Sequence, residues 1–309
     1  MSNTSMHQQI VLITGATAGI GRTTALYLAK LGRHVIATGR KPAELAKLRL
    51  EAAGTKLDTV ELDVTSVLSI TRAAADVQRL TNGYGIDVLV NNAGYGALGP
   101  SSEITDAEMR RQYDTNVFGV MNVIRAFLPA MQARRSGRII NVSSLGGRVT
   151  LPYFGIYNST KYAVESLSDA LRYELHAFGI YVTLIEPGVI RTNFETTALA
   201  DLSKFDGSPY AVSLKKVDAL SKRMNRFAGE PIVIARAIAR AATVRRPAAR
   251  YVAPRLNNVV LALKTVLPTR IFDWSMRKVG YLTKTDLALD RAAAAAAAAT
   301  AKVSLRAVS

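Results

Sequence analysis

Short apolar runs alternate with longer amphipathic segments over the first 190 residues of the chain. The runs rich in Val, Ile and Leu predict buried strands at residues 10–14, 34–38, 57–62, 86–90, 138–142 and 181–186. The segments between them repeat apolar positions at helical spacing, at residues 20–31, 43–53, 66–81, 106–134 and 155–178. Nearly continuous apolar strands that alternate with helices are typical of a parallel sheet covered on both faces. We therefore predict an α/β fold with a doubly wound parallel sheet, in which ligands bind beyond the carboxyl ends of the strands.

The pattern changes after Pro187. Residues 189–229 are polar and hold few strong core positions, and we interpret them as a substrate loop or lid with short helices. Helical spacing returns at residues 230–244, and a last short strand is expected at 250–253. The sequence therefore predicts a single domain over residues 8–255.

A basic amphipathic segment follows this domain. Apolar and basic positions are mixed at helical spacing in residues 257–267 and 269–281, and eight alanines in a row occupy 292–299. Alanine favours helix but offers little apolar surface to bury. We therefore predict a helical extension over 256–290 and a flexible Ala-rich tail over 291–309.

Composition excludes several classes of site. The chain has 309 residues and is 49% hydrophobic, which is enough to bury one sizeable core. It contains no cysteine, so disulfides and thiolate metal sites are excluded. The three histidines, His7, His34 and His176, show no metal-ligand spacing, and we expect no bound metal. Because the polar start leads directly into an apolar strand and no run of about 18 apolar residues occurs, we expect a cytoplasmic protein.

Positive charge gathers in the C-terminal third. Residues 1–200 hold 20 basic and 16 acidic residues, whereas residues 201–309 hold 20 basic and 7 acidic. Such a balance attracts anions, although a solvated Arg-rich surface is the simpler interpretation. No nucleic-acid module is present, so we expect no nucleic-acid partner. The amphipathic extension could lie on an anionic membrane surface, but we favour docking on the body or on another subunit, since apolar stripes usually belong to a core.

Three glycines lie between the first predicted strand and the first predicted helix. Gly15, Gly19 and Gly21 stand in the run Thr-Gly-Ala-Thr-Ala-Gly-Ile-Gly, where glycine lets the backbone turn sharply and approach a pyrophosphate. The helix N-terminus behind them offers free N–H groups and the positive end of its dipole. A glycine-rich turn can be no more than a turn, but its place between strand and helix favours a dinucleotide-binding loop of the Rossmann type.

The end of the second predicted strand indicates which dinucleotide is bound. NAD sites usually carry an acid here for the ribose hydroxyls, whereas this chain has Gly39 followed by Arg40 and Lys41. A guanidinium can bind a 2′-phosphate through two hydrogen bonds, and an acid would repel it. We therefore predict NADP(H), with Arg40 as the main contact. The alternative is that Arg40 and Lys41 only flank a solvated helix start.

Tyr157 and Lys161 form a candidate acid–base pair. They stand four residues apart at the start of a predicted helix, which puts both on one face. A free tyrosine has a pKa of about 10, and a nearby cation lowers this pKa by stabilising the phenolate. The pair could then transfer a proton at moderate pH. The spacing is common on helices, so it supports this chemistry only together with other motifs.

Several motifs follow one another in a fixed order. After the glycine loop come Asn91-Asn92-Ala93-Gly94, Asn116, Ser143-Ser144, Tyr157-x-x-x-Lys161 and Pro187-Gly188. In this order and at these intervals the chain resembles the short-chain dehydrogenase/reductase family over about residues 8–250. The resemblance implies a Rossmann fold and a nicotinamide cofactor. It also implies a homo-oligomer, often assembled through the helices that contain Asn116 and Tyr157.

The resemblance implies roles for four catalytic residues. Ser144 would orient the substrate oxygen, although the adjacent Ser143 is an alternative because the register is ambiguous by one residue. Tyr157 would be the acid in reduction and the base in oxidation, and Lys161 would lower its pKa and bind the nicotinamide ribose. Asn116 would hold a water that links Lys161 to solvent, and its alternative is an Asn inside a helix that bonds to backbone.

The resemblance also implies a set of cofactor-binding residues: Gly15, Thr17, Gly19, Ile20 and Gly21 around the pyrophosphate, Asp63 and Val64 at the adenine, Asn91, Ala93 and Gly94 on the ribose side, and Pro187, Gly188, Val189 and Thr192 at the nicotinamide. Asp63 could instead cap the helix that begins near Ser66. Many NADP-preferring relatives carry a basic residue where this chain has Ala18. Arg40 would then carry recognition of the 2′-phosphate largely alone.

These motifs together predict an NADPH-dependent oxidoreductase that reduces a ketone or aldehyde, or oxidises the matching alcohol. Apolar and aromatic side chains dominate the expected substrate segments, namely Tyr95, Leu98, Leu145, Leu151, Tyr153, Phe154, Ile190 and Phe194. Such a lining suits a small hydrophobic substrate. One alternative is a non-catalytic protein that senses NADPH, because fold does not determine function. The other is a retinoid or steroid dehydrogenase that associates with a membrane surface through the basic extension.

Overall fold

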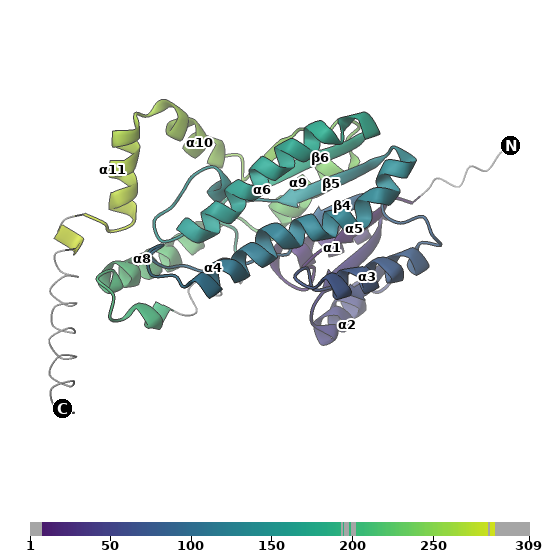
Figure 1. Cartoon of the computed structure of the whole chain (residues 1–309), viewed down its shortest axis with the longest axis horizontal. Helices are drawn as coiled ribbons and strands as arrows, with labels where there is room; N and C mark the ends of the chain where they lie inside the picture. The colour runs from purple at the N-terminus through teal and green to yellow at the C-terminus, as the bar shows by residue number, and fades with distance from the viewer. Residues whose placement is uncertain (1–7, 193, 195–197, 199–201, 284, 288–309) are drawn as a thin grey trace.

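The computed structural model describes residues 8–192, 194, 198, 202–283 and 285–287 (Figure 1). The predicted Ala-rich tail lies outside these residues. Seven parallel strands form one sheet in the order β3-β2-β1-β4-β5-β6-β7. They are β1 (Ile10–Ile13), β2 (His34–Gly39), β3 (Leu57–Glu61), β4 (Val88–Asn91), β5 (Gly137–Val142), β6 (Ile180–Pro187) and β7 (Arg250–Ala253). The predicted doubly wound parallel sheet is confirmed.

Helices cover both faces of this sheet. They are α1 (Gly19–Lys30), α2 (Pro42–Glu51), α3 (Val67–Leu80), α4 (Asp106–Tyr113), α5 (Gly119–Arg134), α6 (Gly155–Glu174), α8 (Ala211–Met224), α9 (Pro231–Thr243), α10 (Asn257–Val266) and α11 (Thr269–Val279). The single helix predicted over 106–134 is wrong in one respect, because a π-helical turn, Asp114–Phe118, separates α4 from α5. This wider turn contains Asn116, whose side chain bonds to a neighbouring loop.

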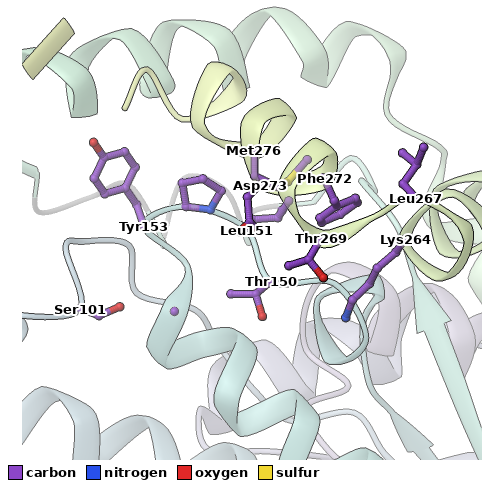
Figure 2. Close-up of a pocket in the computed structure, with 12 residues that line it drawn as sticks. Ser101, Thr150, Leu151, Tyr153, Lys264, Leu267, Thr269, Phe272, Asp273 and Met276 are labelled. Atoms are coloured by element: carbon purple, nitrogen blue, oxygen red, sulfur yellow. The ribbon is translucent and has the colours of Figure 1, made fainter. Parts of the chain in front are cut away.

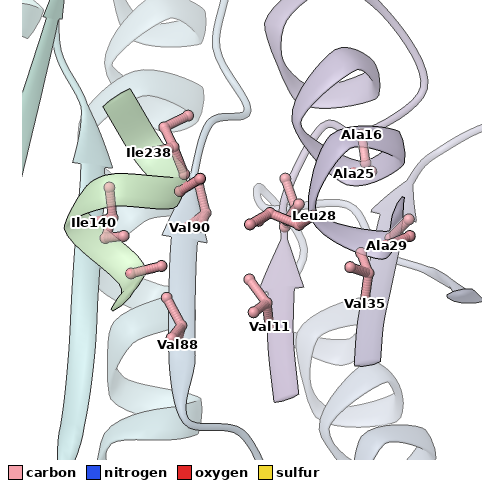
Figure 3. Packing of buried hydrophobic residues seen from close by; sticks show 14 of the residues in the cluster. Val11, Ala16, Ala25, Leu28, Ala29, Val35, Val88, Val90, Ile140 and Ile238 are labelled. Atoms are coloured by element: carbon pink, nitrogen blue, oxygen red, sulfur yellow. The ribbon is translucent and has the colours of Figure 1, made fainter. Parts of the chain in front are cut away.

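Each central strand sends alternate side chains into two separate cores. Val11 of β1, Leu28 of α1 and Ile238 of α9 belong to one core on one face of the sheet, part of which Figure 3 shows. Ile10 and Leu12 of the same strand belong to a second core, formed with α3 and α5 on the other face. Because both faces of the strand are buried, its sequence is apolar throughout and does not alternate between apolar and polar residues.

The strand order reverses between β1 and β4, which lie side by side in the sheet. The helices that follow these two strands go to opposite faces, so a crevice opens beyond their carboxyl ends. The glycine loop follows β1, and Asn91 ends β4. The fold therefore brings two of the predicted motifs to one edge of the sheet.

The segment predicted as a substrate loop is closed at its base. Ile190 and Gly229 form an isolated parallel bridge, in which the Arg191 N–H donates to the Gly229 carbonyl at 2.9 Å. Between these ends the described residues include a 3-10 turn, Leu202–Phe205, and α8. Buried Phe205 and Leu214 from this segment join a third, smaller core.

An arm, residues 255–279, contains α10 and α11 and projects beyond the sheet and its covering helices (Figure 1). Leu261 is the only buried residue of these two helices. The body therefore covers only part of the apolar stripe, and docking of the rest on another subunit stays a prediction. No helix among the described residues is long and apolar enough to cross a bilayer.

Two leucines of α2 test the placement of the core. Leu48 is 0% exposed and Leu50 is 77% exposed, although they are two residues apart. Leu48→Ala should lower the free energy of unfolding by about 2–5 kcal/mol, because it removes buried methyl groups and leaves a cavity. Leu50→Ala should change it by less than about 0.5 kcal/mol. Urea unfolding of both variants measures the difference, and equal losses would contradict the packing of α2.

Candidate active site

Hydrogen bonds join the loops that follow β1 and β4. The Thr14 hydroxyl accepts from the N–H groups of Asn92 at 2.9 Å and Ala93 at 3.0 Å. The Asn92 amide donates to the carbonyls of Thr14 at 3.0 Å and Gly15 at 3.1 Å. Neither Thr14 nor Asn92 was among the predicted site residues, although both stood inside the motifs. Their bonds hold the glycine loop against the predicted ribose-side loop.

Two glycines are required by this close approach. Gly15 has φ +64°, and a Cβ there would lie 2.9 Å from the Ala93 Cα. A Cβ on Gly21 would lie 2.3 Å from the Gly15 carbonyl oxygen. α1 begins after Ala18, which makes no side-chain capping bond, so the first N–H groups of the helix are open to a ligand. This arrangement fits a pyrophosphate, and Gly19, Ile20 and Thr17 lie in the same turn.

The predicted 2′-phosphate contact lies on the surface. Arg40 and Lys41 are exposed after β2, and Lys41 precedes α2 without capping it. Among the described residues no acid pairs with Arg40. The position therefore fits an anion that the guanidinium would bind.

Asp63 does not cap the next helix. The Ser66 hydroxyl caps α3 by accepting from the Ser69 N–H at 3.2 Å. Asp63 instead accepts from the N–H and the hydroxyl of Thr65, at 2.9 and 2.8 Å. The capping alternative is thus wrong, and contact with an adenine stays a prediction. Val64 is buried, and its side chain packs against Gly119.

Asn91 supports the sheet rather than facing solvent. Its buried amide donates to the Asn141 side chain at 2.9 Å, and the Asn141 amide donates to the Ser168 hydroxyl at 2.9 Å. This polar chain links β4, β5 and α6. Because α6 contains Tyr157, these hydrogen bonds also fix the position of the catalytic candidates.

Tyr157, Lys161 and Ser144 lie close together at the start of α6. Tyr157 and Lys161 are both buried, and the Lys161 ammonium lies 5.9 Å from the centre of the Tyr157 ring. The Lys161 Nζ donates to the Val142 carbonyl at 2.9 Å. The loop after β5 thus brings Ser144 beside Tyr157, which stands 13 residues later in the chain.

Burial sets the protonation of this pair. It raises the pKa of Tyr157 to about 12, against a smaller lowering by the hydrogen bond with Ser144. It lowers the pKa of Lys161 to about 8, against a smaller rise caused by Glu165. The net shift of the Tyr157 pKa is therefore upward, because burial dominates it, and a lowering by Lys161 stays a prediction. The phenol is therefore protonated at neutral pH.

The adjacent serines point in different directions. Ser144 bonds to Tyr157 and accepts from the Gly146 N–H at 3.0 Å. Ser143 turns the other way, since a Cβ on Gly147 would lie 2.7 Å from its hydroxyl oxygen. The register that the sequence left open is thereby resolved in favour of Ser144 at the phenol.

Asn116 bonds to backbone from within the π-helical turn. Its carbonyl accepts from the Tyr95 N–H at 3.1 Å, and its amide donates to the Tyr95 carbonyl at 2.8 Å. The amide also donates to the Thr160 hydroxyl at 3.1 Å. A Cβ on Gly94 would lie 3.0 Å from the Asn116 oxygen and 3.7 Å from the Lys161 Nζ. The backbone-bonding alternative is present, and the water link to Lys161 stays a prediction.

The predicted nicotinamide end lies beside the arm. Gly188 follows β6, and its N–H donates to the Ala253 carbonyl at 3.0 Å. A Cβ on Gly188 would lie 1.9 Å from the Asn257 Nδ2, which is buried without a hydrogen-bond partner among the described residues. Asn257 belongs to α10, and no signal in the sequence associated it with the site. Val189 is exposed after Pro187 and Gly188.

Thr192 reaches back to the glycine loop. A Cβ on Gly19 would lie 3.3 Å from the Thr192 side chain. The Thr192 hydroxyl accepts from the Phe194 N–H at 3.3 Å. The segment after β6 therefore closes over the loop that follows β1.

Known proteins are similar to this chain in sequence and in fold. The family model for short chain dehydrogenase matches residues 9–203. The chain belongs to the short-chain dehydrogenase family. It is 36% identical over 277 residues to a 3-ketodihydrosphingosine reductase of Bacteroides thetaiotaomicron, a match that covers 88% of this chain and 98% of that protein.

Two further proteins extend the comparison. The NADPH-dependent 3-dehydrocapnine reductase of Ornithobacterium rhinotracheale is 30% identical, with 85% of this chain and 94% of that protein covered. A crystal structure of a short-chain dehydrogenase from Streptomyces avermitilis has a TM-score of 0.70 and 30% identity, and the match covers 91% of this chain and 100% of that one. As a member of this family, the protein is an oxidoreductase that uses a nicotinamide cofactor and acts on CH–OH or C=O groups.

Ion pairs behind the short-chain dehydrogenase site tie β7 to α6. Arg250 pairs with Glu165 at 3.0 Å, Asp169 at 2.6 Å and Glu186 at 3.2 Å. Burial raises the pKa of Glu165 and of Glu186. Glu165 stands one helical turn after Lys161, so Arg250 balances the acids beneath the catalytic pair. The sequence analysis did not single out Arg250.

Aromatic rings flank the phenol of this family site. The Phe194 ring centre lies 5.1 Å from that of Tyr157, and the Phe154 ring centre lies 6.3 Å from it. A Cβ on Gly96 would lie 2.6 Å from the tip of Phe194. Apolar rings therefore surround the Tyr157 phenol.

A cavity of about 480 Å³ lies between the loop before α6 and the arm (Figure 2). Its apolar lining comes from Leu151, Pro152, Tyr153, Leu267, Phe272 and Met276. Tyr153 has φ +65°, which is unusual for a bulky side chain and holds it in this position. Tyr153 also stands four residues before Tyr157, so the cavity adjoins the start of α6.

The depressed pKa of Lys161 predicts how stability depends on pH. Above a pH of about 8 the folded protein has lost a proton that the unfolded chain keeps up to 10.5. The unfolded state then binds more protons, so this group's contribution to the free energy of unfolding rises with pH through that window and is constant below it. Urea unfolding at several pH values measures the free energy of unfolding of wild type and of Lys161→Met. The wild-type value should rise relative to that of the variant as the pH increases through this window.

The same substitution at exposed Lys30 is the matched control. The burial of the ammonium would be contradicted if the difference in free energy of unfolding between wild type and Lys161→Met stayed constant or shrank from about pH 8 to pH 10.5.

Proposed function

We propose that this short-chain dehydrogenase reduces a hydrophobic ketone or aldehyde with NADPH, using Tyr157 as the proton donor. The observation that carries the proposal is the buried Tyr157 phenol, bonded to Ser144 and with its pKa raised to about 12. A phenol of this kind is protonated at neutral pH, which suits an acid that donates to a carbonyl oxygen.

The chain's own groups perform the positioning and the proton transfer. Ser144 orients the substrate oxygen beside Tyr157, and the phenol proton passes to that oxygen as the carbonyl becomes an alcohol. When bound, the dinucleotide supplies the hydride that the carbonyl carbon accepts. Lys161 lies on the same side as the phenol and stabilises its conjugate base until a proton returns. Asn116 would link Lys161 to solvent through a water.

Arg40 supports NADPH rather than NADH. It is exposed at the carboxyl end of β2, next to Gly39, where no acid stands to receive ribose hydroxyls. A relative that covers most of the chain is named as NADPH-dependent. The homo-oligomer expected from family resemblance is also part of this proposal.

The apolar surroundings support a hydrophobic substrate. Phe154 and Phe194 flank the phenol, and the cavity beside Tyr153 offers further apolar surface. A pocket of this composition gains little from a small, strongly hydrated acid and more from an alkyl or ring system. The two curated relatives are named as reductases of a ketodihydrosphingosine and of a dehydrocapnine.

Tyr157→Phe tests the catalytic assignment. The variant should reduce kcat/KM about 100- to 10,000-fold for every accepted ketone, because it removes the proton donor and leaves the ring. NADPH oxidation with methyl ketones of increasing alkyl length is the measurement, and wild-type kcat/KM should rise with chain length. Tyr162→Phe, five residues later on the same helix and hydrogen-bonded to Lys264, should retain activity.

Equal rates for wild type and Tyr157→Phe would contradict the assignment. Tight binding of NADPH without turnover of any ketone would favour the NADPH-sensing alternative instead.

Arg40→Ala tests the cofactor. Loss of a charged hydrogen-bonding partner for the 2′-phosphate should weaken NADPH binding about 10- to 100-fold and leave NADH binding nearly unchanged. Arg49→Ala, an exposed arginine of α2, is the matched control. Titration of each variant with both dinucleotides gives the ratio, and an unaltered preference in Arg40→Ala would show that another group recognises the phosphate.

A further inference from the structure

The arm exposes an apolar face that the rest of the described chain does not cover. In α10 and at its start, Leu256, Val259, Leu263 and Val266 are exposed, with 78% for Leu256 and 79% for Val266. Their spacing of three, four and three residues places them on one side of the helix. Large apolar side chains aligned in this way mark an interaction surface.

The opposite side of α10 already faces the body. Leu261 is buried there, and the Asn257 amide lies against Gly188. The Lys264 ammonium donates to the Tyr162 hydroxyl at 2.7 Å and to the Arg148 carbonyl. The helix is therefore held in one orientation, and its exposed face is set by these contacts.

α11 has the same division. Ile271 and Trp274 are exposed, the latter to 58%, and they stand three residues apart on one side. Phe272 and Met276 point to the cavity, as Figure 2 shows. Each helix of the arm therefore has an exposed apolar side and a side that meets the body or the cavity.

Basic residues border this face. Residues 255–279 contain five basic side chains and a single acid, Asp273. Arg255, Arg270, Arg277 and Lys278 are exposed, and none of them pairs with an acid within the described part of the chain. An apolar face bordered by unpaired cations matches a bilayer interface with anionic headgroups, and tryptophan is enriched at that depth.

We propose that the arm lies on an anionic membrane surface, with Leu256, Val266, Ile271 and Trp274 among the headgroups. A second copy of the chain is a poorer occupant, because a twofold contact through this face would bring two strongly basic arms together. Since Phe272 and Met276 line the cavity from within the arm, the same contact brings that cavity to the lipid surface.

Trp274 is the only tryptophan of the chain, so its fluorescence reports on the arm directly. Full-length protein should co-float with vesicles of phosphatidylcholine and phosphatidylglycerol, and its emission should shift to shorter wavelength. Vesicles of phosphatidylcholine alone should produce little of either effect, and added salt should weaken both. Absence of binding to the anionic vesicles would overturn the proposal.

Paired variants separate this surface from general adhesion. Ile271→Ser with Trp274→Ser should lower vesicle binding at least about tenfold, whereas Leu50→Ser with Leu68→Ser, at least as exposed on α2 and α3, should not. Arg270→Glu with Arg277→Glu should abolish the emission shift. Arg245→Glu with Arg246→Glu, exposed after α9, changes the net charge equally and should keep it.

Equal effects of the matched pairs would overturn the proposal. So would a dimer that Ile271→Ser with Trp274→Ser converts to monomers while vesicle binding is unchanged, because the face would then belong to a second subunit. Thermal unfolding of each variant confirms that it is folded before binding is compared.

Discussion

The hydrogen bonds between the loops after β1 and β4 are the interaction on which the rest of the site depends. The Thr14 hydroxyl and the Asn92 amide tie two loops that leave the sheet where its strand order reverses. Both strands are buried on both faces, so neither can slide without moving its apolar side chains out of register. The distance between the loop after β1 and the loop after β4 is therefore fixed by the strands. The backbone of Gly15 then lies so close to Ala93 that no side chain fits between them.

Burial controls the protonation of Tyr157 and Lys161, because it raises the pKa of the phenol and lowers the pKa of the ammonium. Burial makes the phenol hold its proton more strongly and the ammonium hold its proton less strongly, so it shifts both groups toward their neutral forms. The acids beneath the pair would be costly without Arg250, which pairs with Glu165 and Glu186 from the last strand of the sheet. Loss of one partner from such a cluster leaves a buried charge uncompensated.

The arm joins two properties that are separate in the sequence. Its inner side contacts Gly188 through Asn257 and lines the cavity through Phe272 and Met276. Its outer side presents apolar and basic groups to the surroundings. One short pair of helices thus contacts the segment after β6, lines the cavity and carries the surface for which we infer a lipid partner.

The sequence by itself determined the sheet, the glycine loop and the pairing of Tyr157 with Lys161. These features depend on short-range spacing, which survives without knowledge of the fold. Only the tertiary structure chose Ser144 over Ser143, since adjacent residues differ only in the direction of their side chains. It also reversed the expected pKa shift of Tyr157, because burial depends on what the rest of the chain places around the ring.

The sequence did not indicate the contacts of Arg250 and Asn257, because these contacts also depend on the fold. Arg250 is 85 residues from Glu165 along the chain, and the two meet only when β7 joins the sheet. The direction of the arm's stripe was equally undecided, because helical periodicity is identical whether an apolar face meets a core or solvent. Spacing along the chain determines which side chains share a face, and only packing determines what that face meets.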